Sequence, residues 1–315
     1  HVKIANMSTA NAAPGSTVSA AFVTGMLSAC EQHGLNPAAL LHHAEIAIDV
    51  LHTPQARIPL PRYAQLYNHV TGLLDDEGFG LFSQPLRSGC FEFLCRSVLH
   101  AATLEEALTR AARFLHLVLP DLAVRLESTG GTARLRISET RPLSTGRTFA
   151  FEWLLRLLHG LACWLTDRSL TLDRVDFPYP RPAHAADYAL IYTADSRFDA
   201  SSLVAQFDAR LLALPVRRDE LALKNFLLGA PGRISTLYRR DRETASRVRD
   251  CLRSGLPEML KLEEVAARLY LSPRTLHRRL QQEGSAFQTI KDNLRRELAL
   301  EWLGKTRLPL SRIAG

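Results

Sequence analysis

The sequence predicts an α+β protein, with a mixed α/β domain containing antiparallel strands followed by an all-helical domain. Apolar residues recur at helical spacing through most of the first 120 residues, the period changes to two between Leu122 and Ile137, and every signal after Ile234 is helical again. A length of 315 residues suggests about two domains. A hydrophobic content of 46% excludes disorder as the main state, and no apolar stretch predicts a transmembrane helix or signal peptide.

Four helix starts are expected before residue 120, each marked by a capping residue or a proline: Ser16 or Thr17, Asn36–Pro37, Pro61, and Thr103. Glu106 stands three residues after Thr103, as in a capping box, and the apolar stripe behind it ends at Pro120.

Strict alternation then predicts a β-hairpin. Leu122–Leu126 and Ala133–Ile137 each alternate apolar with polar residues, around an expected four-residue loop at Ser128–Gly131. A long helix is expected from Ala150 to Leu165, with short strands around Leu172–Phe177 and Tyr188–Tyr192.

The positive charge is concentrated in the last quarter of the chain. Residues 231–315 hold 18 lysines and arginines against 10 acids, a net of +8, whereas residues 1–230 have a net of −1. This asymmetry indicates a nucleic-acid partner for the C-terminal end, with a merely solvated basic face as the alternative.

Two short helices with a tight turn are predicted between Lys261 and Gly284. Leu262, Val265, Ala266 and Leu269 form an apolar stripe at helical spacing, and Ser272 followed by Pro273 is a strong start for the second helix. The second helix turns two leucines inward and presents mostly basic and amide side chains outward: Arg274, Thr275, His277, Arg278, Arg279, Gln281 and Gln282. This pattern is typical of a helix-turn-helix that reads the major groove of DNA, and a helical hairpin that contacts nothing is the alternative.

These residues resemble the first helix-turn-helix of AraC/XylS-type bacterial transcription regulators. The matching stretch is Val265–Leu276, followed as in the family by Gly284, Phe287 and a helix containing Arg296 and Trp302. The resemblance implies a first helix-turn-helix at 261–284, a connecting helix at 286–303 and the start of a second unit at 308–315. The second recognition helix would be missing, which makes 234–315 a truncated DNA-binding domain.

The upstream region resembles an arabinose-binding-like sensor domain of the ornithine-utilisation-regulator type. Arg57–Leu60 and Leu99–Ala112 carry this resemblance. It implies a small-molecule sensor at 16–228 that also contributes to dimerisation. The run Gly229-Ala230-Pro231-Gly232 predicts a linker at 229–233, and the small, polar composition of residues 1–15 predicts an expression remnant plus a disordered start.

The resemblance also implies roles for individual residues in DNA binding. Arg274, His277 and Arg278 would contact base edges. The residues expected to contact phosphate or backbone are Ser272, Thr275, Arg279 and Lys291.

An effector pocket is also expected, because such pockets are mostly apolar with a few polar groups, with plain core as the alternative for aromatic residues at helical spacing. The candidates are aromatic side chains with neighbouring polar groups: Arg113, Phe114, His116, Trp153, Arg156, His159 and Trp164.

We predict neither a metal nor a cofactor. The five cysteines include one close pair, Cys90 and Cys95, but no second pair completes a metal site, so reduced thiols in a cytoplasmic protein are expected. Four histidines, His33, His42, His43 and His52, are expected to be ordinary surface or packing residues.

The function expected is sequence-specific transcription regulation rather than enzyme activity, because no phosphate-binding loop, dinucleotide fingerprint or nucleophile elbow is present. The expected partners are double-stranded promoter DNA, an unidentified small-molecule effector and a second copy of the chain, with RNA polymerase as a further candidate. The alternatives are a small-molecule-binding protein or enzyme with an incidental basic tail, and a non-specific DNA-compacting protein.

Overall fold

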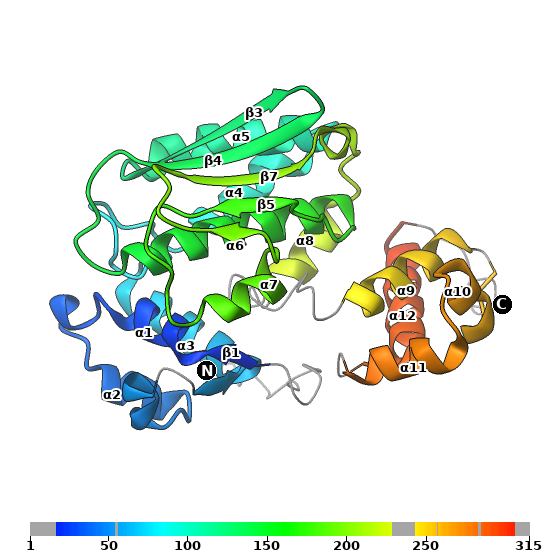
Figure 1. The fold of residues 1–315 in the computed structure, drawn as a ribbon, viewed down its shortest axis with the longest axis horizontal. Coiled ribbons are helices and arrows are strands. Elements are labelled where there is room, and N and C mark those ends of the chain that lie inside the picture. The colour runs from blue at the N-terminus through cyan, green and yellow to red at the C-terminus, as the bar shows by residue number, and fades with distance from the viewer. Residues whose placement is uncertain (1–16, 54–55, 229–242, 257, 283–284, 306–315) are drawn as a thin grey trace.

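The computed structural model describes residues 17–53, 56–228, 243–256, 258–282 and 285–305. The expectations for residues 1–15, the linker at 229–233, the helix end at Gly284 and the second helix-turn-helix at 308–315 therefore lie outside the described residues. Two separate hydrophobic cores are present, one from Val18 to Phe226 and one from Val248 to Leu294. The first contains helices and strands and the second only helices (Figure 1), which confirms the α+β class.

A five-stranded sheet lies in the upper part of the view in Figure 1, with its strands in the order β3-β4-β7-β5-β6. Its neighbours are antiparallel except β5 and β6, which are parallel. The strands are β3 (Leu122–Thr129), β4 (Thr132–Glu139), β5 (Arg174–Asp176), β6 (Ser196–Arg197) and β7 (Leu203–Asp208). A separate two-stranded sheet pairs β1 (Thr17–Ser19) with β2 (Arg57–Pro59).

The predicted hairpin is confirmed, but its loop is shorter than expected. Leu126 pairs with Leu135 and Thr129 with Thr132, so only Gly130 and Gly131 form the turn. Their φ angles of 61° and 82° are those of a tight two-residue hairpin turn, which glycine adopts without steric cost.

The described residues up to 228 contain eight α-helices. They are α1 (Ala20–Leu27), α2 (Pro37–His43), α3 (Leu60–Leu74), α4 (Cys90–Leu99), α5 (Leu104–Val118), α6 (Arg147–Thr166), α7 (Tyr188–Ile191) and α8 (Glu220–Leu227). α5 and α6 pack against the buried side of β4 and β7, where Leu108, Leu155, Leu135 and Phe207 meet.

Capping side chains set two of the predicted helix starts. Asn36 Oδ1 accepts a hydrogen bond from the Ala38 amide at 2.9 Å, and Thr103 Oγ1 accepts one from the Glu106 amide at 3.3 Å. The Glu106 carboxylate accepts from the Ala102 amide at 2.7 Å, one residue earlier than a capping box requires.

The expected start of the first helix is wrong. Thr17 belongs to β1, and Ser19 instead caps α1 by accepting a hydrogen bond from the Ala21 amide at 3.2 Å. Pairing with β2 keeps residues 17–19 extended, which moves the helix start two residues along the chain.

The strand expected at Tyr188–Tyr192 is also wrong, because this segment contains helix α7. Tyr188, Ile191 and Tyr192 are all buried. Their spacing of three and four residues matches one face of a helix, so an apolar run of this length fits either structure until its neighbours are known.

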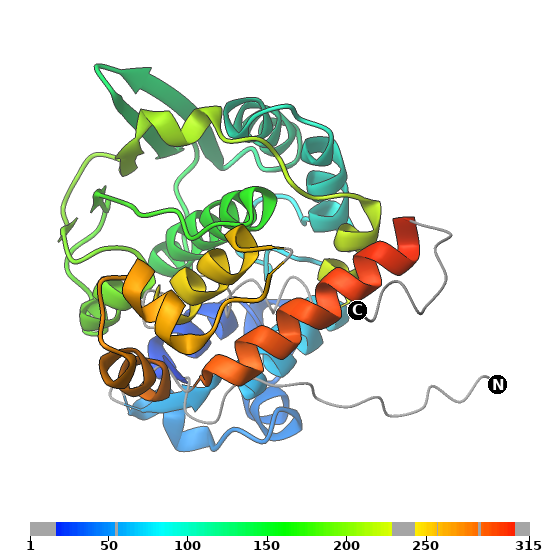
Figure 2. The same cartoon turned by 90° about the vertical axis from the view of Figure 1, so that its right-hand side faces the viewer.

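In the described residues after 242, four helices form a group around the second core: α9 (Glu243–Ser254), α10 (Leu262–Arg268), α11 (Pro273–Gln282) and α12 (Phe287–Lys305). The long helix α12 runs across this group (Figure 2). The second core contains one or more buried side chains from each of the four helices, among them Val248, Val265, Leu276 and Leu294. Among the described helices, none is both long and apolar enough to cross a membrane.

Candidate nucleic-acid interface and effector pocket

The turn between α10 and α11 is built as the sequence predicts. Ser272 Oγ accepts a hydrogen bond from the Thr275 amide at 3.1 Å, and the two hydroxyls lie 2.8 Å apart. Pro273 is the first residue of α11, and Leu276 and Leu280 are buried against the second core. These contacts fix which face of α11 is turned to solvent.

The solvent face of α11 is basic. Arg274, His277 and Arg278 are exposed and recur at the three- and four-residue spacing of one helix face, with exposed Arg279 beside them. None of these four side chains has a hydrogen-bond or ion-pair partner among the described residues. Their donors are therefore available to an anionic or acceptor-rich ligand.

The other predicted phosphate contacts have internal roles as well. The Ser272 and Thr275 hydroxyls are engaged in the helix cap. Lys291 on α12 is half-buried, and its Nζ donates to the carbonyl oxygens of Met259 at 3.4 Å and Leu260 at 3.2 Å. These two bonds tie α12 to the segment before α10. Because an ammonium group has three donors, one donor of Lys291 is left for a further partner.

One residue beside this surface was missed by the sequence reasoning. Tyr270 lies in the turn that precedes α11 with a φ of 55° and is 95% exposed. A bulky residue with a positive φ is a conformational outlier. A signal was available, because Tyr270 interrupts the apolar stripe of α10.

The seven predicted pocket residues do not converge on one cavity. Arg156 lines one pocket and Phe114 another, and Trp153 contributes to both. His159 lines a third, apolar pocket between α5, α6 and the sheet. Arg113 and His116 line an open groove between α5 and β3.

Trp164 is a core residue that lines none of these four pockets. It stacks on Phe226 of α8 with ring centroids 4.3 Å apart, and the Arg218 guanidinium lies 5.6 Å from its ring centroid. It links α6 to α8.

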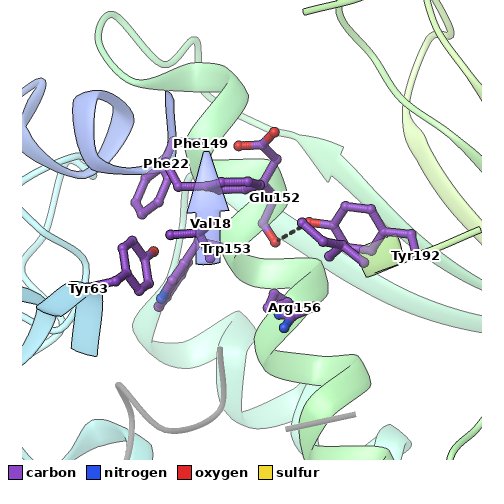
Figure 3. Close-up of a pocket in the computed structure, with 9 residues that line it drawn as sticks. Val18, Phe22, Tyr63, Phe149, Glu152, Trp153, Arg156 and Tyr192 are labelled. Carbon is purple, nitrogen blue, oxygen red and sulfur yellow. Dashed lines mark hydrogen bonds between the residues drawn. The ribbon is translucent and has the colours of Figure 1, made fainter. Parts of the chain in front are cut away.

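The strongest candidate for an effector site lies between β1, α1, α3, α6 and α7 (Figure 3). The space that it offers to water-sized molecules is about 30 Å³, and its mouth opens to solvent. The lining is mostly aromatic and aliphatic: Val18, Phe22, Tyr63, Phe149, Glu152, Trp153, Arg156, Ile191 and Tyr192. Such a lining, with few polar groups, is typical of small-molecule sites.

The sequence reasoning missed Glu152, the acidic residue of this pocket. Glu152 is 2% exposed, and its Oε1 accepts hydrogen bonds from the Tyr188 hydroxyl and, at 2.6 Å, from His184 Nε2. Burial and the nearby Glu152 charge raise the pKa of Tyr188 well above its usual value, so Tyr188 remains a donor. Glu152 is flanked by apolar positions of α6, and nothing in the sequence shows whether its side chain is buried or exposed.

Hydrogen bonds also hold the aromatic wall of the pocket in place. Trp153 Nε1 donates to the Tyr67 hydroxyl at 2.8 Å, and the Tyr192 hydroxyl donates to the Glu152 backbone oxygen at 3.0 Å (Figure 3). Burial raises the pKa of both Tyr67 and Tyr192. The wall is thus fixed before any ligand arrives.

No group of three or more histidine, cysteine, aspartate or glutamate side chains in the described residues could hold a metal ion. The five cysteines are free thiols. Of the four histidines noted in the sequence, His33 contacts the Gly80 carbonyl oxygen at 3.2 Å, and the His43 ring stacks on His69 with centroids 3.7 Å apart.

Comparison with known proteins identifies the chain. Residues 34–216 match the family described as the N-terminal arabinose-binding domain of the AraC transcription regulator. The chain belongs to this family of transcription regulators. The match covers more than half of the chain and leaves no role for the enzyme alternative.

One curated relative spans nearly the whole AraC-type chain. This relative is the ornithine utilization regulator of Pseudomonas aeruginosa. It is 29% identical to this chain over 302 residues, which cover 94% of this chain and 88% of the relative. A solved structure, the transcriptional regulator CdpR from Pseudomonas aeruginosa, matches 93% of this chain and 88% of its own length, at 17% identity and a TM-score of 0.34.

Proposed function

We propose that this AraC-type regulator binds promoter DNA in the major groove through α11 and senses a small molecule through its N-terminal part. The observation that carries the proposal is the face formed by Arg274, His277 and Arg278, which is exposed, basic and without internal partners in the described structure. Arginine donates two hydrogen bonds to guanine O6 and N7, and each such pair discriminates against a wrong base by about 1–3 kcal/mol.

The position of this face within the C-terminal helices supports the proposal. Leu276 and Leu280 hold α11 on the second core by its apolar side, so the basic side is presented on a rigid element. Ser272 and Thr275 lie at the start of α11, Arg279 in its last turn and Lys291 on α12, where they would contact phosphates on either side of the groove. The excess of positive charge in residues 231–315 would supply the sequence-independent part of the affinity.

We further propose the domain division expected from the sequence, with a sensor at 16–228, a linker at 229–233 and a DNA-binding domain at 234–315. A second copy of the chain is the proposed partner, because one half-site gives limited specificity against a genome of competing sites. The named relative regulates ornithine utilization. We carry over from it only the role of regulator, and a cytoplasmic location follows from the proposed binding to promoter DNA.

The test is selection of duplexes from a random pool, followed by fluorescence anisotropy with the selected and scrambled duplexes. The wild-type chain is expected to prefer the selected duplex. Arg278→Ala should reduce that preference by about tenfold, the equivalent of one lost bidentate contact. The matched control is Arg210→Ala, since Arg210 is a surface arginine of the N-terminal part that pairs with Asp208. Equal affinity of the wild-type chain for both duplexes would overturn the proposal.

A further inference from the structure

One edge of the five-stranded sheet is a long strand that has no partner strand on its outer side in the described structure. β3 is the last strand in the order of the sheet and pairs only with β4 (Figure 1). Its eight residues include no proline, no lysine and no bulge, which are devices by which proteins usually block a free edge. The opposite edge is β6, which has two residues. β3 is therefore the edge that offers a full ladder to a further strand.

The pairing of β3 with β4 fixes which backbone groups of β3 point outward. The Thr140 amide donates to the Asp121 carbonyl oxygen at 2.9 Å, just before the strand begins. Hydrogen-bonded and non-bonded pairs alternate in an antiparallel ladder, so the odd-numbered residues of β3 bond to β4. The amides and carbonyls that point away from β4 belong to the even-numbered residues, Leu122, Val124, Leu126 and Ser128. None of these outward groups has a hydrogen-bond partner among the described residues.

A groove runs along this edge. One wall is Leu122–Leu126, a run of consecutive residues from both faces of β3, and the lining includes no residue of β4. The other wall is one face of α5, formed by Thr109, Ala112, Arg113 and His116. The space open to water is about 550 Å³, against about 30 Å³ in the aromatic pocket beside α6. The groove therefore leaves room for a neighbouring strand.

The charges on the outer face of β3 are self-complementary. Arg125 is exposed, lies directly opposite Arg136 of β4 and has no hydrogen-bond or ion-pair partner among the described residues. Like charges in directly opposed positions destabilise a sheet. Two residues along the strand, Glu127 accepts a hydrogen bond from Arg136 at 3.2 Å, and this bond lowers the pKa of Glu127. Each copy of β3 therefore carries both a cation that lacks a carboxylate and an ionised carboxylate.

Among antiparallel registers that pair most of two β3 strands, one brings these charges together. With a two-fold axis at Leu126, Arg125 lies opposite Glu127 of the second copy, and Glu127 lies opposite Arg125 of that copy. An axis at Arg125 would oppose two arginines, and an axis at Glu127 would oppose two glutamates. An axis at Val124 would place Arg125 opposite Ala123. The register about Leu126 also pairs even-numbered residues with each other, so the outward amides and carbonyls of the two copies meet.

We propose that two copies of the chain associate through their β3 strands, antiparallel about a two-fold axis at Leu126. This contact joins the two sheets into one, and each copy satisfies the outward backbone groups of the other. Two symmetry-related pairs of Arg125 with Glu127 form on the solvent face. The inference deepens the proposed function and rests on it, because it names the surface by which the second copy proposed there is bound.

The experiment is sedimentation velocity of the whole chain without DNA, over a series of concentrations. The wild-type chain is expected to dimerise. Arg125→Glu and Glu127→Arg each turn two attractive pairs into repulsive ones, so each variant alone should dimerise at least about tenfold more weakly. An equimolar mixture of the two variants should recover the dimer, because only the mixed pair opposes unlike charges at both positions.

The matched control is Arg197→Glu on β6, at the opposite edge of the sheet, where Arg197 pairs with Asp195. This variant should dimerise as the wild type does, and near-ultraviolet circular dichroism checks that all variants are folded. A wild-type chain that stays monomeric, a dimer that neither Arg125→Glu nor Glu127→Arg weakens, or a mixture no stronger than the separate variants would overturn the proposal.

Hydrogen exchange of the wild-type chain measures the edge itself and needs no variant. In the dimer the amides of Val124, Leu126 and Ser128 should be protected. Dilution into the monomer should expose them, while the odd-numbered amides of β3 stay protected by β4. Equal exchange of these three amides in the monomer and the dimer would also overturn the proposal.

Preference for the selected duplex is measured on the same protein. A chain that prefers this duplex but does not associate through β3 would count against the interface alone. A chain that associates through β3 but shows no duplex preference would count against DNA reading by α11 alone.

Discussion

Asp167, at the end of α6, accepts a hydrogen bond from Arg253 of α9, so one carboxylate joins the N-terminal part of the chain to the C-terminal helices. Arg218 donates to the same carboxylate, and Arg249 lies 3.6 Å from it. The C-terminal end of a helix carries partial negative charge, which adds to that of Asp167 and attracts these arginines. Because Glu152 and Arg156 lie on the same helix, α6 connects the pocket to this contact.

Asp167→Asn is expected to lower the free energy of unfolding by about 1.5–3 kcal/mol, the range for hydrogen bonds to charged groups. The Asp167 side chain is 5% exposed and that of Arg218 12%, so the lost charge is poorly replaced by water. Urea denaturation followed by circular dichroism measures the change. Asp208→Asn is the control, because its partner Arg210 has a side chain 90% exposed and solvent screens the pair, so that its loss should change stability less than the loss of Asp167 does. Equal losses in the two variants would contradict the role given to Asp167.

His159 is expected to make stability depend on pH. Burial lowers the pKa of His159 from 6.5 to about 4, while its Nε2 donates to the Leu170 carbonyl oxygen at 2.7 Å. Above pH 6.5 both the folded and unfolded states have a neutral ring. As the pH falls from 6.5 towards 4 the unfolded state takes up the proton first, so stability falls, by up to about 3 kcal/mol.

The measurement is the urea midpoint of the wild-type chain and of His159→Gln between pH 7.5 and pH 4.5. Other groups titrate in both proteins, so the difference between the two curves isolates His159. A constant difference across this range would show that the ring is not held neutral.

Tyr270→Asn is expected to stabilise the C-terminal helices by about 0.5–1 kcal/mol. Asparagine tolerates positive φ better than tyrosine does, and the tyrosine side chain is 95% exposed, so little packing is lost. Slower hydrogen exchange in α10 and α11 would support this. Tyr270→Phe keeps the strained conformation and should leave the exchange rates unchanged.

Lys291→Met and Arg279→Ala are expected to differ in one respect. As phosphate contacts, each should flatten the dependence of log affinity on log salt by about one unit. Only Lys291→Met should also lower stability, by about 1 kcal/mol, because Lys291 Nζ bonds two carbonyl oxygens whereas Arg279 has no partner in the described structure. An unchanged salt slope in Lys291→Met would restrict that lysine to its structural role.

Local patterns in the sequence predicted local structure well. The hairpin, the long helix α6 and the cap at Ser272 follow from alternation, helical spacing and capping chemistry within a few residues. The hairpin loop was predicted too long because Ser128 and Thr129 read as turn residues, although they continue the ladder of β3.

Features set by distant residues were not predictable. Strand β7 was missed because its structure depends on pairing with β4, such as Leu135 with Ala205, and a single sequence does not display such pairs. The predicted pocket residues scatter for the same reason, while Glu152 becomes distinctive only when Tyr188 and His184 bond one of its oxygens. The face of α11 was predictable because one helix carries all of it.

Dimethyl sulfate protection on a selected duplex shows whether α11 reads base edges, since this reagent methylates guanine N7 in the major groove. We expect the bound wild-type chain to protect at least one guanine, and Arg278→Ala, at saturating concentration, to restore methylation at one of the protected guanines. Binding that leaves every guanine N7 unprotected, or protection unchanged in Arg274→Ala, His277→Ala and Arg278→Ala, would contradict the claim that α11 reads base edges.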